Sequence, residues 1–371
     1  MSARERRAHT ASVWEGRARS VRRELAALAA TGCGVAELHT AAIDLVDRIV
    51  PTDLTCWASL DPDTAVISSM TSGRARIPGE YEPLLATYEY DGAEPHTFAQ
   101  LARRPVPVAR LSDLPRRERE RSGRWAQVWR PLGLESELRV GFRADGVCWA
   151  AAGLVRRGEF SDREVEFLTS IGPTLAAATR VAALARGAVS AVEPAIVVVG
   201  PDGRRRGATE GVGVWESELD AIADGRFAVL VRAVAVGAQS AAGGTFRARV
   251  RDARGGWIVL QASRLVSDDA AGDDARDVVV TIRRASGGEL LDVLLAAYRL
   301  TARERDVCRE VLSGLSTSDI AARLGISANT VQDHLKSVFG KVGVRSRGEL
   351  TARLSGWAGD LSHSGIVGSP H

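Results

Sequence analysis

The sequence predicts an α+β protein of several domains that ends in a bundle of four helices. Strand-length apolar runs alternate with helical patterns across residues 13–285, as in mixed α+β domains. Helix-capping residues punctuate Leu300–Leu354, which carries no strand pattern. With 371 residues, the chain is long enough for about two or three domains. We therefore expect domains at 13–186, 194–285 and 296–357.

The first domain begins with two helical patterns, Val13–Ala30 and Val35–Val50, and Pro51 ends the second. Runs rich in β-formers predict strands at Leu54–Leu60 and Ala65–Met70. An irregular or helical stretch, Tyr81–Leu101, is followed by an arginine-rich helix, Arg116–Trp129. Two strands come next, Ser136–Arg143 and Gly146–Arg156, joined by the turn Ala144-Asp145-Gly146. The last element is a helix with a capping box, which runs from Ser161 to about Ala185. The arginines of Arg116–Trp129 alternate with glutamates, which favours a solvated helix over a second nucleic-acid surface.

The second domain follows a small-residue linker, Gly187–Glu193. It is expected to begin with a buried strand, Ala195–Val199, a turn, Gly200–Gly203, and a helical region that continues through Ala241. A hairpin of Phe246–Arg251 and Trp257–Leu265 follows, and the last strand is Val278–Arg283. This pattern predicts a second, smaller α+β domain.

The C-terminal stretch contains the strongest signals. Side-chain caps precede carboxylates by three residues at Thr301, Ser316 and Ser346, and Ser327 can cap the remaining helix. The helices Ser316–Leu324 and Ser327–Val342 are joined only through Gly325-Ile326. That spacing predicts a helix-turn-helix and therefore DNA binding.

The second helix of this pair has an apolar back formed by Val331, Leu335, Val338 and Val342. Its other side is polar, as expected of a helix that enters the major groove. The residues expected to contact base edges are Asn329, Gln332, Asp333 and Lys336. Those expected to contact phosphates are Thr317, Ser318, Thr330, Ser337 and Lys341.

The same stretch resembles the LuxR-type DNA-binding module. The matching motifs run from Leu300-Thr301-x-Arg303-Glu304 through Gly314-Leu315-Ser316 and Thr330-Val331-x-x-His334-Leu335 to Lys341-x-Gly343-Val344-x-Ser346-Arg347. The resemblance implies pairing of two copies through the last helix, with Leu350 and Leu354 in the contact. We therefore expect a homodimer on double-stranded DNA.

The first domain resembles the GAF family in the segments PVPVARLSDL, GLESELRVGF to CWAAAGLVRR, and FSDREVEFL. The resemblance implies a cavity for a small molecule between the sheet and the inserted segments. Trp57, Phe142 and Trp149 are the candidates to line it by position, with ordinary core packing as the alternative. The second domain is similar to a small PAS-like domain and carries no distinctive cofactor ligand.

Charge and composition exclude several classes. The net charge is +3, and Leu300–Ser355, with nine basic and six acidic residues, accounts for all of it. The two lysines, Lys336 and Lys341, both lie in the predicted recognition helix, so no phosphate-binding GxxxxGK[ST] loop precedes them. Neither the cysteines nor the histidines cluster, and no catalytic set stands out, so no metal, cofactor or catalytic residue is predicted.

The expected function is a one-component transcription regulator with sensor regions ahead of its DNA-binding domain. Two alternatives are a DNA-binding scaffold whose sensor-like domains bind only protein partners and an enzyme with an appended helix-turn-helix. A quorum-sensing acyl-lactone domain is a further possibility for the sensor, although the expected Trp, Tyr and Asp pattern is not recognisable. No apolar run reaches membrane-spanning length, so we expect a cytoplasmic protein.

Overall fold

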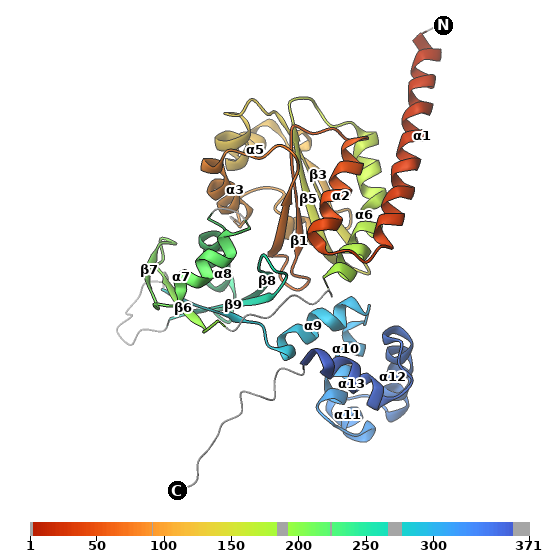
Figure 1. The fold of residues 1–371 in the computed structure, drawn as a ribbon, viewed down its shortest axis with the longest axis vertical. Coiled ribbons are helices and arrows are strands. Elements are labelled where there is room, and N and C mark those ends of the chain that lie inside the picture. Colours follow the sequence, from red (N-terminus) through yellow and green to blue (C-terminus); the bar gives the residue numbers. More distant parts are fainter. Residues whose placement is uncertain (1–2, 91, 184–191, 223–224, 266–276, 359–371) are drawn as a thin grey trace. The chain divides into compact units, whose positions relative to one another are not determined.

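The computed structural model describes residues 3–90, 92–183, 192–222, 225–265 and 277–358. The chain falls into two compact units, Met1–Arg284 and Ala285–His371 (Figure 1). The first unit contains two five-stranded sheets whose neighbouring strands are all antiparallel. The described residues of the second unit form helices and short connections. The predicted α+β class with a helical C-terminal domain is confirmed.

The first sheet has the strand order β2-β1-β5-β4-β3. Its strands are β1 (Leu54–Leu60), β2 (Ile67–Ser72), β3 (Val108–Arg110), β4 (Ser136–Ala144) and β5 (Val147–Arg156). The predicted β4–β5 hairpin is present, with positive φ angles of 54° at Asp145 and 80° at Gly146. The strand order follows from two local hairpins, β1–β2 and β4–β5, and from a long insertion between β2 and β4. The described part of that insertion contains one strand, β3, which pairs with β4 at the edge of the sheet.

Helices cover both faces of this sheet. One face carries α2 (Val35–Asp47) and α6 (Asp162–Ala182), with α1 (Ala3–Ala29) packed against both helices (Figure 1). The capping box at Ser161 is confirmed, because the Ser161 backbone N–H donates to the Glu164 carboxylate over 2.7 Å. No helix in the described ranges is both long and apolar enough to cross a membrane.

The opposite face carries the inserted segments α3 (Glu82–Glu89), α4 (Phe98–Arg103) and α5 (Arg116–Arg121). The arginine-rich segment is not one continuous helix as predicted, because α5 ends at Arg121 and a π-helical turn, η3, spans Trp125–Trp129. Arg124 lies in the break and is 2% exposed, held by Glu137 and Glu94. The buried carboxylates, which sequence spacing does not reveal, explain why this arginine leaves the solvated face.

The second sheet has the order β7-β6-β10-β9-β8, which repeats the connectivity of the first. Its elements are β6 (Ala195–Val199), β7 (Arg205–Ala208), α7 (Val212–Asp220), α8 (Arg226–Ser240), β8 (Thr245–Arg251), β9 (Trp257–Arg264) and β10 (Val278–Arg284). The edge strand β7 was predicted as part of a helical region. Its four residues are all exposed, so it lacks the apolar alternation that marks a strand.

Contacts between the two sheets explain why they form one unit. The carboxylate of Asp61, at the end of β1, accepts hydrogen bonds from the backbone N–H and the Nε–H of Arg249 in β8, both over 2.9 Å. Asp61 is fully buried, and Arg249 is 6% exposed. Val66, in the same β1–β2 connection, packs into the core of the second sheet. The predicted linker Gly187–Glu193 lies mostly outside the described residues. Among the described residues, these contacts help to join the two sheets.

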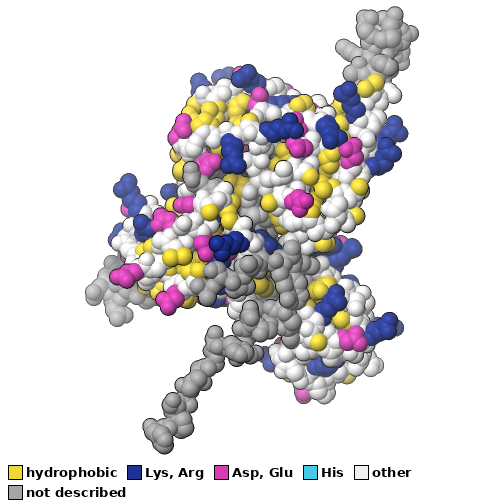
Figure 2. Space-filling model, in the orientation of Figure 1, with side chains coloured by type: hydrophobic (Ala, Val, Ile, Leu, Met, Phe, Trp, Pro, Cys, Tyr) yellow, Lys and Arg dark blue, Asp and Glu magenta, His cyan; other side chains and the backbone are white. Residues whose placement is uncertain are grey.

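The face of the first unit seen in Figure 2 intersperses basic and acidic side chains. The exposed ion pair of Arg116 with Glu120, 2.8 Å apart within α5, is one example of this pattern. It matches the solvated surface predicted for most of the arginine-rich segment.

The C-terminal unit consists of α9 (Gly287–Ala297), α10 (Ala302–Leu312), α11 (Thr317–Leu324), α12 (Ala328–Val342) and α13 (Arg347–Ala358). The four predicted helices correspond to α10–α13. The additional helix α9 was not predicted, and its Leu295 is fully buried in the core of this unit. The unit therefore begins ahead of the expected boundary at residue 296.

Leu350 and Leu354 do not form a dimerisation surface. They are 0% and 1% exposed and belong to the core of their own domain, together with residues of α9–α12. The apolar stripe on the last helix was read correctly, but it faces the preceding helices of the same chain. Pairing of two copies through the last helix stays a prediction, in which exposed residues of that helix would have to make the contact.

The junction between the two sheets supplies a stability prediction. Asp61→Ala should lower the free energy of unfolding of the first unit by about 3–5 kcal/mol, because it leaves the buried Arg249 guanidinium short of its main partner. Asp63→Ala is the matched control. Asp63 also pairs with Arg249, but its side chain is 41% exposed, so the loss should stay below about 1 kcal/mol.

Urea unfolding followed by tryptophan fluorescence measures both variants. Equal losses for the two substitutions would show that the buried pair does not hold the sheets together.

Candidate functional site

The helix-turn-helix predicted in the C-terminal unit is present. Gly325 ends α11 in the left-handed conformation, with φ of 66°. Ser327 caps α12, and its hydroxyl accepts from the Thr330 backbone N–H over 3.1 Å. The turn between the helices is thus residues 325–327. A glycine is needed at the first of these because other residues rarely adopt positive φ.

The apolar back of α12 is buried as predicted, through Val331, Leu335, Val338 and Val342. The four residues expected to contact bases, Asn329, Gln332, Asp333 and Lys336, are all exposed. The Gln332 side-chain amide lies 3.5 Å from the Thr317 hydroxyl, so it also bridges α12 to the start of α11. The helix is fixed on one side and offers polar side chains on the other.

Three residues expected to contact phosphate lie at helix N-termini. Thr317 and Ser318 begin α11, and Thr330 lies in the first turn of α12. The Ser318 hydroxyl is 2.8 Å from that of Ser316, and the Thr330 hydroxyl is 2.8 Å from that of Ser327. Hydroxyls and backbone N–H groups at a helix N-terminus suit an anion, so their geometry is compatible with the prediction.

The two remaining phosphate candidates are committed to an internal network. The Lys341 ammonium donates to both carboxylate oxygens of Glu304 over 2.8 and 2.6 Å, and the Ser337 hydroxyl donates to the same carboxylate over 2.6 Å. Glu304 lies in α10, and its side chain is 6% exposed. The network ties the C-terminal half of α12 to α10.

Electrostatics keep Glu304 ionised. Burial alone would raise the pKa of this carboxyl group, but hydrogen bonds from Lys341, Ser337 and Thr301 lower the pKa to about 2. The carboxylate is therefore charged throughout the physiological range, and its cationic partner is Lys341. Sequence reasoning treated Glu304 only as a cap of α10 and missed this second role.

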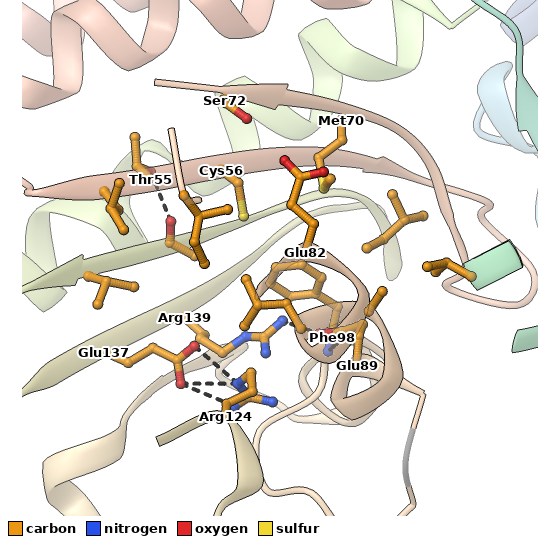
Figure 3. A pocket seen from close by; sticks show the side chains of 18 of the residues that line it. Thr55, Cys56, Met70, Ser72, Glu82, Glu89, Phe98, Arg124, Glu137 and Arg139 are labelled. Atoms are coloured by element: carbon orange, nitrogen blue, oxygen red, sulfur yellow. Dashed lines mark hydrogen bonds and ion pairs between the residues drawn. The ribbon is translucent and has the colours of Figure 1, made fainter. Parts of the chain in front are cut away.

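A cavity in the first unit is the second candidate site. It has a volume of about 150 Å³ and lies between β1, β2, β4 and β5 of the first sheet and the inserted segments. Figure 3 shows Thr55, Cys56, Met70 and Ser72 on two strands and the charged groups of Arg124, Glu137 and Arg139 at another end. Most of the remaining lining is apolar.

The charged end of the cavity is internally paired. Arg139 forms an ion pair with Glu89, and Arg124 lies 3.1 Å from Glu137. Burial opposes ionisation of Glu137, but Arg124 and Arg139 lower its pKa below the ordinary value. The Arg139 guanidinium also lies over the Phe98 ring, 3.9 Å from its centroid. These ion pairs therefore keep the buried arginines and glutamates charged.

The three aromatic residues predicted to line a cavity do not line this one. The Trp57 ring packs against Phe142, with centroids 5.0 Å apart, and against His39 of α2, at 5.9 Å. Trp149 is 2% exposed. Trp57 and Phe142 serve the core under the α2–α6 layer, on the opposite face of the sheet.

The polar lining could have been suspected from the sequence. Glu137 and Arg139 are two residues apart on the predicted strand Ser136–Arg143, so they project from the same face. Opposite charges on one face of a strand with apolar neighbours are unusual and often functional. Glu89 and Arg124 give no such signal, because only the fold brings them to the same place.

Comparison with known proteins gives a family match for the C-terminal unit. Residues 298–354 match the family described as bacterial regulatory proteins, luxR family. This helix-turn-helix domain is therefore of the LuxR family, as its motifs indicated.

Among curated relatives, an HTH-type transcriptional regulator in the exeN 3′ region of Aeromonas salmonicida is 36% identical over 90 residues, 24% of this chain and 43% of that protein. The transcriptional regulatory protein UhpA of Salmonella typhimurium is 42% identical over 69 residues, 18% of this chain and 35% of UhpA. The chain thus spans less than half the length of either relative.

Among solved structures, the phycoerythrobilin-bound GAF domain of a cyanobacterial phytochrome is 15% identical, with a TM-score of 0.33, and covers 45% of this chain and 96% of its own. The VqmA–ligand–DNA complex of Vibrio cholerae is 15% identical, with a TM-score of 0.21, and covers 45% of this chain and 84% of its own.

The Glu304 network supplies a pH prediction. The folded-state pKa of about 2 lies below the reference value of 4.5, so ionised Glu304 stabilises the C-terminal unit above about pH 4.5, and this contribution is lost as the pH falls toward 2. The destabilisation caused by Glu304→Gln should therefore shrink by roughly 2 kcal/mol between pH 6 and pH 3.

Urea unfolding, monitored by hydrogen exchange in peptides from α10 and α12, measures the destabilisation of the C-terminal unit alone at each pH. A destabilisation that is the same at both pH values would contradict the assigned network.

Proposed function

We propose that the protein is a one-component transcription regulator, in which the LuxR-family domain at 298–354 binds specific sites on double-stranded DNA. The observation that carries the proposal is the geometry of α12, which has a buried apolar back and an exposed row of polar side chains. DNA as the partner places the protein in the cytoplasm. The named relatives are transcriptional regulators, and this supports the same class of function.

Within this proposal, residues of α11 and α12 have two distinct roles. Asn329, Gln332, Asp333 and Lys336 read base edges, because amide, carboxylate and ammonium groups match the donors and acceptors of the major groove. Thr317, Ser318 and Thr330 contact phosphate at the helix N-termini. Lys341 and Ser337 act differently from the original expectation: they position α12 through Glu304.

The first unit is the proposed sensor. Its cavity lies between a sheet and inserted helices, as expected for a GAF-like domain, and its apolar lining and buried polar groups suit a small molecule. The second sheet, with the same strand order, acts as a PAS-like domain between this cavity and α9. A homodimer on DNA is part of the proposal, since a two-fold site would double the contacts of α12.

Two lysine variants separate DNA contact from helix positioning. Lys336→Met removes an exposed cation and should weaken DNA binding. The slope of log K against log salt concentration should fall in magnitude by about one unit. Lys341→Met is the matched control, since it breaks the Glu304 network. It should destabilise the C-terminal unit and leave the salt slope almost unchanged once measured on folded protein.

Fluorescence anisotropy at several salt concentrations, together with thermal unfolding, gives both quantities. A salt slope that falls for Lys341→Met and not for Lys336→Met would reverse the two assignments.

Asp333→Ala tests base reading. Loss of a negative charge should tighten binding to random duplex slightly, while discrimination at one base pair should fall by roughly 1–3 kcal/mol if the carboxylate accepts from cytosine N4. Competition titrations with operator and single-base variants measure the discrimination. Full retention of discrimination would mean that Asp333 faces away from the bases.

A further inference from the structure

One wall of the cavity belongs to the second sheet's own helix. Arg226, Val229 and Leu230 of α8 line it together with residues of β1, β2 and α3. Val229 and Leu230 lie three and four residues after Arg226, so both share a helix face with it. The same helix packs on β8, β9 and β10. A single element thus contacts both the cavity and the second sheet.

Arg226 joins the two sheets beside the cavity. Its guanidinium donates to the Ser68 carbonyl in β2 over 2.6 Å and to the Arg251 carbonyl in β8 over 2.9 Å. The side chain is buried, and burial lowers its pKa to about 10, so it stays cationic at neutral pH. Charge-assisted bonds to a carbonyl on each side resist displacement of β2 from α8.

The other first-sheet elements around the cavity also reach the second core. Tyr90, which caps α3 and lines the cavity, accepts a hydrogen bond at its hydroxyl from the Ile67 backbone N–H over 3.2 Å. Its ring packs against the core of the second sheet. A ligand that displaces β2 or α3 therefore also strains contacts with α8 and its sheet.

The cavity's chemistry limits what can occupy it. A volume of about 150 Å³ compares with an engineered apolar cavity of the same size that holds benzene. The buried charges beside it are already paired, so an added ionic group would be desolvated without a free counter-charge. Three lining residues carry a buried donor atom with no hydrogen-bond partner in the described part of the chain: Arg124 Nη1, Trp129 Nε1 and Arg139 Nε. The cavity therefore has donors for an acceptor atom of a ligand.

We propose that α8 forms a wall of the ligand site, so that an uncharged, compact, mainly apolar molecule with a hydrogen-bond acceptor binds both sheets of the first unit at once. This inference rests on the proposed sensor function and adds the class of ligand and the element that detects it. A ligand shifts a conformational equilibrium only if it binds the two states differently, and a wall supplied by α8 provides that difference.

The test uses the full chain with two probes, acetophenone and benzoate, which have the same number of non-hydrogen atoms and differ in charge. Binding is measured by ligand-observed NMR, and backbone protection by hydrogen exchange. Acetophenone should bind the unmodified protein at least about tenfold more tightly than benzoate and should slow exchange in both α3 and α8.

Three substitutions locate the wall. Val229→Phe, on the cavity face of α8, should weaken acetophenone binding by about tenfold, a loss of about 1.4 kcal/mol. Leu85→Phe, on the α3 side, should weaken it similarly. Ala228→Phe, on an exposed position of α8, is the matched control and should leave binding unchanged. Hydrogen exchange on the unmodified chain tests the same wall without any substitution, so the test does not depend on the variants folding.

The outcomes separate the two levels of the proposal. If Leu85→Phe abolishes binding while Val229→Phe has no effect and exchange in α8 does not change, the cavity is a ligand site but α8 is not its wall. If benzoate binds and acetophenone does not, the ligand class is wrong. If neither probe binds the unmodified protein, the sensor role of this cavity is itself overturned.

Discussion

The ion pair between Glu304 and Lys341 is the interaction on which the proposed DNA-binding surface depends. It anchors the C-terminal half of α12 to α10, while Gln332 bridges the N-terminal half to the start of α11. The apolar back of α12 is buried along the length of the helix. A recognition helix has to be held rigidly, because base contacts need donors and acceptors placed within hydrogen-bonding distance. In the proposed function, Lys341 therefore positions the helix, and Lys336 is the lysine that contacts DNA.

Buried ion pairs play a comparable role in the first unit. Asp61 with Arg249 joins the two sheets, and Arg226 bridges them beside the cavity. Such groups are costly to bury, so they stabilise one relative arrangement of their elements more than they stabilise the fold as a whole. Because α8 also packs on β10, and β10 ends three residues before α9 begins, occupancy of the cavity has a short covalent route to the C-terminal unit.

The features predicted correctly are local in sequence. Capping residues such as Thr301, turn glycines such as Gly325 and the β4–β5 hairpin are determined by neighbours within a few positions. The errors concern long-range contacts. The stripe containing Leu350 was correctly read as apolar, but nothing in it indicates whether its partner is the same chain or another copy. Lys341 was predicted only as a phosphate contact, and its ion pair with Glu304 was missed because Glu304 lies 37 positions away.

The central claim is that the exposed side of α12 reads a DNA sequence. In vitro selection from a random duplex pool tests it most directly, using the full chain and a variant in which Asn329, Gln332, Asp333 and Lys336 are all replaced by alanine. We expect the unmodified protein to enrich a defined motif and the variant, although folded, to enrich none. Enrichment of the same motif by both proteins, or of no motif by the unmodified protein, would contradict it.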